Sequence, residues 1–366
     1  LGSEQLATWA RIALEVIPGP APDEALRAAL TTVQGRPLIG VINSIGVRRD
    51  EKAVYPLVTK LKHPRPEIAS AAAIALGHIG SDSAARALEA ALTEGPANLR
   101  SAVAEGCILC AERWLAEGKA AKAVALYDTV RKKDLPPQRA AEATRGAILA
   151  RGPNGIPLLL EQLQSSNKSL YAIGLRTARE LPGTQVTEAL AAQLSQLSPE
   201  RQSRVLLALA DRSDDAVLPA VKAAAKEGSK ETRVAALNVL QHVGNASCIP
   251  LLVDAATADD PAIAQAANAS LAALHDSDAD ADLSRLLPQA QGKQRQVLIE
   301  AASARRIESA VPMALRFATD PDPALRKAAS DALGALAAAQ EIAPMVDLLK
   351  AASPQDRSHL EPALLA

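Results

Sequence analysis

Two cysteines come closest to a reactive site in this sequence, Cys107 and Cys110 in the stretch GCILCAER. On a helix, residues three positions apart share a face, so the pair could form a redox couple or hold a metal. A zinc site needs two more ligands at matching spacing, and none lies nearby. A catalytic thiol pair would open a helix in an α/β unit, which the sequence lacks. We therefore interpret both cysteines, and Cys248, as small buried residues, and expect no metal and no cofactor.

Four aspartates occupy alternate positions in the stretch HDSDADADLSR. They are Asp276, Asp278, Asp280 and Asp282. A calcium loop between two helices requires glycine at its sixth position and glutamate at its twelfth. Counted from the first aspartate, these positions hold Ala281 and Leu287. Acidic residues before a helix are stabilised by the positive end of its dipole, so the pattern favours a helix start over a calcium site.

Two histidines, His78 in LGHIG and His242 in LQHVG, occupy matching positions near the ends of helical stretches. A cation at the end of a helix interacts favourably with the helix dipole, which gives both a structural role. The sequence contains no GxSxG or HExxH motif and no paired grouping of His, Ser and Asp. We therefore predict that the chain is not an enzyme.

A row of arginines is the remaining pattern that could bind a ligand, because they recur at one position of a sequence repeat. They are Arg139, Arg233, Arg295 and Arg326, with Arg100 one residue away from that position. If the repeats stack, the guanidinium groups line up on a concave surface and could bind an acidic peptide or sugar-acid groups. The alternative is an internal row that pairs with carboxylates of neighbouring repeats, such as Glu231, Asp260 and Asp322. We favour the internal row, since unpaired like charges repel.

The elements that must position these residues recur about every 31 residues. Prolines mark the repeat, at Pro56, Pro157, Pro219, Pro250, Pro312 and Pro344. From Pro157 onward they are spaced by one or two repeat lengths, and only the last spacing is a single residue longer. Each repeat is expected to hold a first helix with proline in its first turn, a polar corner, and a second, Ala-rich helix that ends near glycine. One such hairpin cannot bury its own apolar faces, and stacking the hairpins supplies the burial.

The stretch RPLIGVINSIGVRRDEKAVYPL, residues 36–57, could be mistaken for a phosphate-binding loop because of its glycines and its Arg48-Arg49-Asp50 corner. Shifted by one repeat, Gly46 aligns with Gly77, which lies near the end of a second helix. No Gly-Lys-Ser/Thr follows the stretch and no strand precedes it. We predict that Gly46 closes a second helix and that residues 48–50 link it to the next hairpin.

One interval breaks the period. The stretch from Ala87, which aligns with the proline positions, to Pro157 is longer than two repeats by about eight residues. The excess lies in residues 110–152, which contain Trp114, Tyr127 and a double proline. We predict a longer, irregular helical pair there and the least generic surface of the molecule.

The composition agrees with packed helices and excludes several classes. The 366 residues are 48% hydrophobic but only 2% aromatic, which disfavours a β-sandwich or barrel. The net charge of −1 argues against a nucleic acid or an anionic membrane held by electrostatic attraction. Three cysteines form no disulfide framework and leave the compartment open. No run of about 20 apolar residues occurs, so we predict no membrane span.

The proline-started first helix, the Asp/Pro corner and the Ala-rich second helix resemble HEAT repeats, in AVYPLVTKLKHPRPEIASAAAIALGHIG and AVPMALRFATDPDPALRKAASDALGALA. The short repeats look most like the bacterial kind that is also found in bilin-lyase-like proteins. The resemblance covers essentially the whole chain. It implies an all-α fold, a right-handed α-α superhelix or HEAT/armadillo-like solenoid of about ten to eleven short helical hairpins. We expect one such solenoid over residues 1–366, cut at both ends.

Residues 9–54 resemble the repeat region that accompanies 3-keto-disaccharide hydrolase domains in bacterial multidomain proteins. That enzyme domain is not contained in these residues. The resemblance implies a non-catalytic arm of a carbohydrate-related protein, and it is also the one indication of an exported location. The sequence itself leaves the location undetermined.

These patterns predict a non-enzymatic scaffold or spacer that binds a protein or positions an attached domain of the same polypeptide. A lyase-like enzyme would need a pocket of converging polar groups, which the sequence does not indicate. A nucleic-acid binder would need a continuous basic stripe and aromatic stacking platforms, and both are lacking. Apolar helix faces left open at the two ends would favour self-association.

Overall fold

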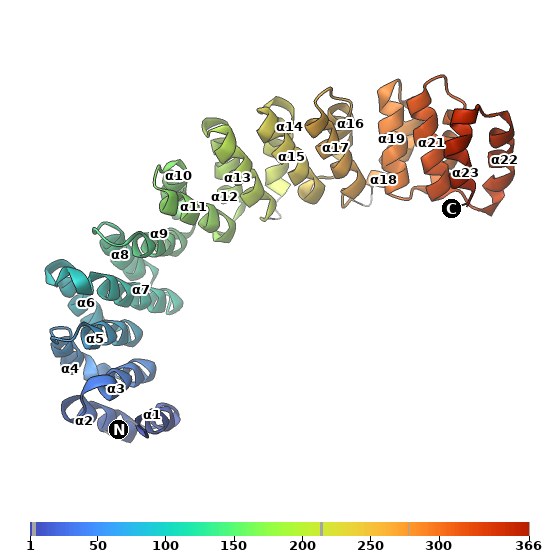
Figure 1. The fold of residues 1–366 in the computed structure, drawn as a ribbon. Helices are drawn as coiled ribbons and strands as arrows, with labels where there is room; N and C mark the ends of the chain where they lie inside the picture. Colours follow the sequence, from blue (N-terminus) through green and yellow to red (C-terminus); the bar gives the residue numbers. More distant parts are fainter. Residues whose placement is uncertain (2–4, 213–214, 277, 366) are drawn as a thin grey trace. The chain divides into compact units, whose positions relative to one another are not determined.

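The computed structural model describes residue 1 and residues 5–212, 215–276 and 278–365. Every regular element within these residues is a helix (Figure 1). The contacts divide the chain into two compact units, Leu1–Val186 and Thr187–Ala366. The all-helical solenoid predicted from the sequence is confirmed, whereas a single solenoid over the whole chain stays a prediction.

In the first unit, helices of a first row alternate with helices of a second row. The helices are α1 (Ala7–Val16), α2 (Pro20–Thr32), α3 (Gly35–Arg48), α4 (Val54–Lys60), α5 (Pro66–Ile79), α6 (Asp82–Glu94), α7 (Arg100–Ala116), α8 (Ala120–Arg131), α9 (Pro137–Arg151), α10 (Ile156–Gln164) and α11 (Lys168–Glu180). The odd-numbered helices α3, α5, α7, α9 and α11 pack side by side, and each also packs on the even-numbered helix before it. Residues 110–152 hold the end of α7, which has 17 residues, with α8 and α9, which has 15.

The second unit repeats this arrangement. After α12 (Thr184–Gln193), in which the boundary falls, come α13 (Pro199–Ala210), α14 (Leu218–Glu227), α15 (Lys230–Val243), α16 (Ile249–Ala256), α17 (Pro261–Ala273), α18 (Ala279–Leu286), α19 (Lys293–Ala304), α20 (Val311–Phe317), α21 (Pro323–Leu336), α22 (Ile342–Ala351) and α23 (Pro354–Leu365). The odd-numbered helices α13 to α23 again pack on one another in sequence order. Short 3-10 turns precede several of the even-numbered helices, as Ala246–Cys248 precedes α16.

The repeat period predicted from the prolines is confirmed in this unit. The even-numbered helices begin at Leu218, Ile249, Ala279, Val311 and Ile342, so that each starts about one repeat after the last. Pro219, Pro250 and Pro312 occupy the first turn of their helices. Proline lacks the N–H that the first turn leaves unbonded in any case, so it starts a helix at no cost in hydrogen bonds.

Glycines allow odd-numbered helices of the first unit to approach backbone to backbone. A Cβ added to Gly46 of α3 would lie 2.9 Å from the Cα of Ala75 on α5. A Cβ added to Gly77 of α5 would lie 2.5 Å from the carbonyl oxygen of Gly106 on α7. Gly46 and Gly77 therefore share the packing role that their alignment in the sequence indicates.

The joint between two hairpins begins at Arg49, so the prediction that Gly46 closes the helix placed its end two residues too early. Helix α3 ends at Arg48, and Arg49 adopts a left-handed conformation with φ of 58°. Its N–H donates to the Gly46 carbonyl at 3.0 Å, and that of Asp50 donates to the Ile45 carbonyl at 3.3 Å. Paired bonds of this kind close the end of a helix.

The core is aliphatic, and few aromatic rings enter it. Tyr127 of α8 is 2% exposed and Trp114 of α7 is 7% exposed, whereas Trp9 and Tyr55 lie on the surface. Alanine, leucine, valine and isoleucine fill most of the space between the helices of each unit. Among the described residues, no helix has the length and apolar character needed to cross a membrane.

Candidate functional site

In the second unit, the arginines of the predicted row contact the protein itself. Arg233 donates from Nε to the Ala225 carbonyl at 3.1 Å. Arg295 donates to the Ala290 carbonyl at 2.9 Å and approaches Asp320 at 3.5 Å. These side chains fasten the start of an odd-numbered helix to the turn before it.

Arg326 of α21 makes the most extensive of these contacts. Its Nε donates to Asp356 Oδ1 of α23 at 2.9 Å, and its Nη1 donates to the carbonyls of Asp320 and Pro321 at 2.9 and 3.0 Å. Hydrogen bonds from Ser353 and from Arg326 hold the pKa of Asp356 below its usual value. The guanidinium thus joins two successive repeats.

In the first unit, Arg139 and Arg100 differ from each other. Arg139 of α9 forms ion pairs with Glu105 of α7 and, at 2.7 Å, with Glu142 of its own helix. Arg100 begins α7, and its Nε is buried with no hydrogen-bond partner among the described residues. The structure therefore gives four of the five predicted arginines partners within their own unit.

The carboxylates named as candidate partners of the arginine row have other contacts, which corrects that part of the sequence analysis. Glu231 accepts from the Ser229 hydroxyl. Asp260 pairs with Lys230 at 2.7 Å and caps α17, and Asp322 caps α21. Aspartates directly before a helix accept N–H bonds from its first turn, so their carboxylates are already engaged.

Replacing Arg326 by methionine is expected to lower the free energy of unfolding of the second unit by about 1–2 kcal/mol, because Asp356 and two carbonyls lose their donor. Thermal melts of the two proteins at pH 7 measure this loss. An unchanged melt together with a lost binding partner would instead support a binding role for the arginine row.

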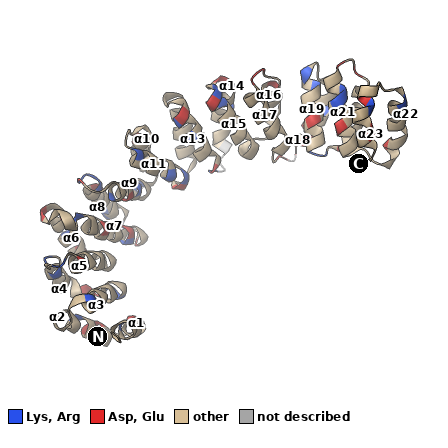
Figure 2. Ribbon diagram, viewed as in Figure 1, with Lys and Arg blue, Asp and Glu red and all other residues tan. Residues whose placement is uncertain are grey.

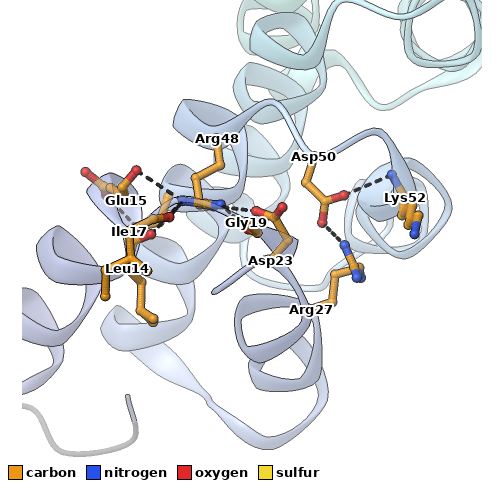
Figure 3. A network of polar contacts seen from close by, with 10 residues as sticks. Leu14, Glu15, Ile17, Gly19, Asp23, Arg27, Arg48, Asp50 and Lys52 are labelled. Atoms are coloured by element: carbon orange, nitrogen blue, oxygen red, sulfur yellow. Dashed lines mark hydrogen bonds and ion pairs between the residues drawn. The ribbon is translucent and has the colours of Figure 1, made fainter. Parts of the chain in front are cut away.

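A second set of arginine contacts lies at the opposite ends of the odd-numbered helices and was not anticipated from the sequence. Arg48, at the end of α3, donates from Nη1 to the carbonyls of Leu14 and Ile17 at 2.7 and 2.8 Å. Its Nη2 donates to Gly19 at 3.0 Å, and its Nε pairs with Asp23 of α2 (Figure 3). One guanidinium thus satisfies the carbonyls left open at the end of α1.

Arg305 repeats this arrangement in the second unit. It donates to the carbonyls of Leu271 and Leu274 at the end of α17 at 3.2 and 2.7 Å, and it pairs with Asp280 of α18 at 2.6 Å. The residue after it, Arg306, is left-handed with φ of 58°, as is the residue after Arg48. Both arginines are the first residue of an Arg-Arg pair in the sequence. This repeated pair is the sequence signal from which the two contacts could have been predicted.

The aspartates in HDSDADADLSR serve separate structural purposes. Asp276 accepts from the backbone N–H of Ala246 at 2.6 Å, which lowers its pKa together with the N–H of Asp278. Asp280 pairs with Arg305 and Asp282 with Arg285. No group of three potential metal ligands occurs within the described part of the chain.

The histidines and charged residues show no concentration of one sign. His78 and His242 lie in the last turns of α5 and α15, as predicted. Figure 2 shows basic and acidic positions interspersed along the ribbon of each unit.

The cysteines are buried, as predicted. Cys107, Cys110 and Cys248 are all 0% exposed. Burial raises the pKa of Cys110 to about 12 and also raises that of Cys107. A thiol reacts as its thiolate, so these groups are inert in the folded chain.

An aromatic disulfide reagent added at pH 8 is therefore expected to modify essentially no thiol of the native protein, and all 3 thiols in strong denaturant. Absorbance of the released thiolate measures both numbers. Rapid reaction of one native thiol would contradict the burial.

A hollow of about 320 Å³ opens between α7 and α9 of the first unit. Its lining residues are Glu112, Leu115, Ala116, Tyr127, Glu142, Arg145, Gly146 and Leu149. Burial raises the pKa of Glu112, and the positive charge of Arg145 opposes that shift. The hollow lies in the segment 110–152, which the break in the repeat period had singled out.

Comparison with known proteins agrees with this architecture. The family model described as HEAT repeats matches residues 22–107 and 220–303. No curated protein matches the sequence. The karyopherin Kap121p bound to the extreme C-terminus of the protein phosphatase Cdc14p is similar over 98% of this chain and 51% of its own, with 12% identity and a TM-score of 0.47. This chain therefore spans about half the length of that karyopherin.

Two further solved structures are similar at lower scores. An engineered protein is 17% identical, with 93% of this chain and 97% of that chain covered and a TM-score of 0.32. Human deoxyhypusine hydroxylase in complex with glycerol is 16% identical, with 74% and 90% covered and a TM-score of 0.30. The described residues thus form an all-helical fold that contains HEAT repeats, at residues 22–107 and 220–303.

Proposed function

We propose that the chain is a non-enzymatic scaffold that binds a protein, as one segment of a larger multidomain bacterial protein. The observation that carries the proposal is a strip of exposed side chains, Val47, His78 and Glu112, that occur on consecutive odd-numbered helices of the first unit, α3, α5 and α7. Val47 of α3 is 59% exposed, and His78 of α5 occupies the matching position one repeat later. Glu112 of α7 is also exposed, and it lines the hollow described above together with Arg145 of α9. Extended strips of mixed character on stacked repeats are typical protein-binding surfaces.

The strip combines three kinds of contact that a protein partner can use. Val47 offers apolar surface, and His78 can donate or accept a hydrogen bond. The carboxylate of Glu112 and the Arg145–Glu180 pair, at 2.6 Å, supply charge. The finer proposal, an accessory arm of a 3-keto-disaccharide hydrolase-type protein, is supported by the resemblance of residues 9–54.

A photoreactive phenylalanine analogue placed at Val47 or at His78 tests the strip, with Ala90 on the exposed face of α6 as the matched control. After irradiation in cells that contain the parent protein, mass spectrometry identifies the adducts. We expect the same partner protein at Val47 and His78 and none at Ala90. No adduct at either strip position, or adducts confined to Ala90, would overturn the proposal.

Helix α1 exposes an apolar face, and the predicted self-association could occur through this face. Trp9 and Val16 are 73% and 78% exposed, and Ile12 lies between them at 48%. Residues at these spacings share one side of a helix. Association through this face stays a prediction, and sedimentation of a Trp9→Ser variant against the unaltered chain measures it.

A further inference from the structure

The packing of α7 against α9, where the hollow lies, differs from the packing of α5 against α7. The backbones of α5 and α7 meet directly at Gly77 and Gly106. Between α7 and α9, the ring of Tyr127 enters from α8, and a Cβ on Gly146 would collide with that ring. An aromatic ring placed where other repeats bring two backbones together leaves a hollow beside it.

The floor of the hollow is formed by the side chain of Tyr127. Tyr127 as a whole residue is only 2% exposed, and it lines the hollow. A group bound in the hollow can therefore form a hydrogen bond with the Tyr127 hydroxyl.

The rim carries the exposed carboxylate of Glu112. Glu112 forms no ion pair or hydrogen bond among the described residues. The other charged groups of the rim are engaged, since Glu142 accepts from Arg139 at 2.7 Å and Arg145 donates to Glu180 at 2.6 Å. The free acceptor capacity of the hollow is therefore concentrated at Glu112.

The walls between floor and rim are apolar. Leu115 and Ala116 of α7 face the hollow, as does Leu149 of α9. A ligand that fits must combine an apolar stem with a polar head that donates hydrogen bonds. A carboxylate head would meet the unpaired negative charge of Glu112, and a wholly apolar group would form no contact with that carboxylate.

We propose that this hollow binds the side chain of a lysine or arginine that projects from the partner protein, an inference that rests on the proposed scaffold function. The cationic head donates to the Glu112 carboxylate and to the Tyr127 hydroxyl oxygen. The methylene stem lies along Leu115 and Leu149, as long basic side chains commonly cover apolar surface. Hydrogen bonds to a charged group add more to affinity than neutral ones do.

Fluorescein-labelled octapeptides of alanine and leucine that differ only at one central position test this inference with the full chain. The central residue is lysine, arginine, norleucine or glutamate, and fluorescence polarisation measures binding. Glu112→Gln and Tyr127→Phe each remove one proposed contact and keep the shape of the side chain. Glu94→Gln is the matched control, because Glu94 is exposed at the end of α6, away from the hollow.

We expect the lysine and arginine peptides to bind the unaltered chain at least about fivefold more tightly than the norleucine peptide. Glu112→Gln should abolish this preference, Tyr127→Phe should reduce it, and Glu94→Gln should leave it intact, at equal melting temperatures. Equal binding of all four peptides, tighter binding of the glutamate peptide, or no binding at about 1 mM would overturn the inference. If one of these results overturned the inference while photocrosslinking still gave adducts at Val47 and His78, the proposed scaffold function would stand. The scaffold function itself fails only if those adducts are missing.

Discussion

Replacing Gly77 by alanine is expected to lower the free energy of unfolding of the first unit by about 1–3 kcal/mol. The added Cβ would lie 2.5 Å from the Gly106 carbonyl oxygen and 2.7 Å from the Gly106 Cα. Both are backbone atoms that cannot turn aside, so α5 and α7 must move apart. Urea unfolding followed by circular dichroism measures the loss, and hydrogen exchange of the amides in α5 and α7 locates it.

Gly40→Ala is the matched control, because this glycine also lies in an odd-numbered helix and faces its predecessor. A Cβ there would approach the Arg11 guanidinium carbon at 2.5 Å, which is the end of a flexible side chain. Alanine also favours a helix over glycine by about 1 kcal/mol. We therefore expect Gly40→Ala to change stability little. If the two variants lost equal amounts of unfolding free energy, the close backbone contact at Gly77 would not be what requires glycine there.

The repeat architecture could be predicted from the sequence because its signals are local. Pro219, Pro250 and Pro312 start helices by a property of their own backbone, and Gly46 and Gly77 occupy one position of consecutive repeats. Such features depend on neighbours within one hairpin, so the repeat period displays them directly.

The partners of the arginines could not be predicted, because they depend on how far successive repeats are offset. Arg139 was expected to be one of a row, but the partner that it takes, Glu105, lies 34 residues earlier on the neighbouring helix. Glu231 and Asp322 looked equally suitable by charge alone. A shift of one helical turn between stacked helices exchanges one carboxylate for another, and the sequence period does not fix that shift.

The break in the repeat period marked the segment that contains the hollow, but it did not indicate which residues line the hollow. The lengthened interval pointed to residues 110–152, where Glu112, Tyr127 and Arg145 meet. Tyr127 lies on α8, whereas Glu112 and Arg145 lie on the two helices beside it. The insertion of its ring depends on Gly146, whose significance appears only once the helices are in place.

Replacing Arg48 by methionine is expected to cost the first unit about 2–4 kcal/mol, the larger of the two arginine effects. The side chain of Arg48 is 10% exposed, and that of its partner Asp23 is 25% exposed. Methionine retains the apolar stem but leaves Asp23 without its cation and the carbonyls of Leu14, Ile17 and Gly19 without a donor. Lysine restores the charge but cannot reach all of these acceptors at once, so Arg48→Lys should fall between the two.

The control for this prediction is Arg65→Met, because the Arg65–Glu67 pair in the same unit is 3.8 Å long with side chains 52% and 64% exposed. An exposed pair of this kind contributes at most about 1 kcal/mol. Thermal unfolding compares the stabilities, and hydrogen exchange of α1 and α2 reports whether Arg48 holds these helices against α3. If Arg48→Met and Arg65→Met melted alike, the contacts at the end of α1 would contribute no more than a surface ion pair. If the amides of α1 and α2 exchanged early only in Arg48→Met, the Arg48 guanidinium would be the group that holds these helices against the following repeats. We would then expect Arg305 to have the same role at the end of α17.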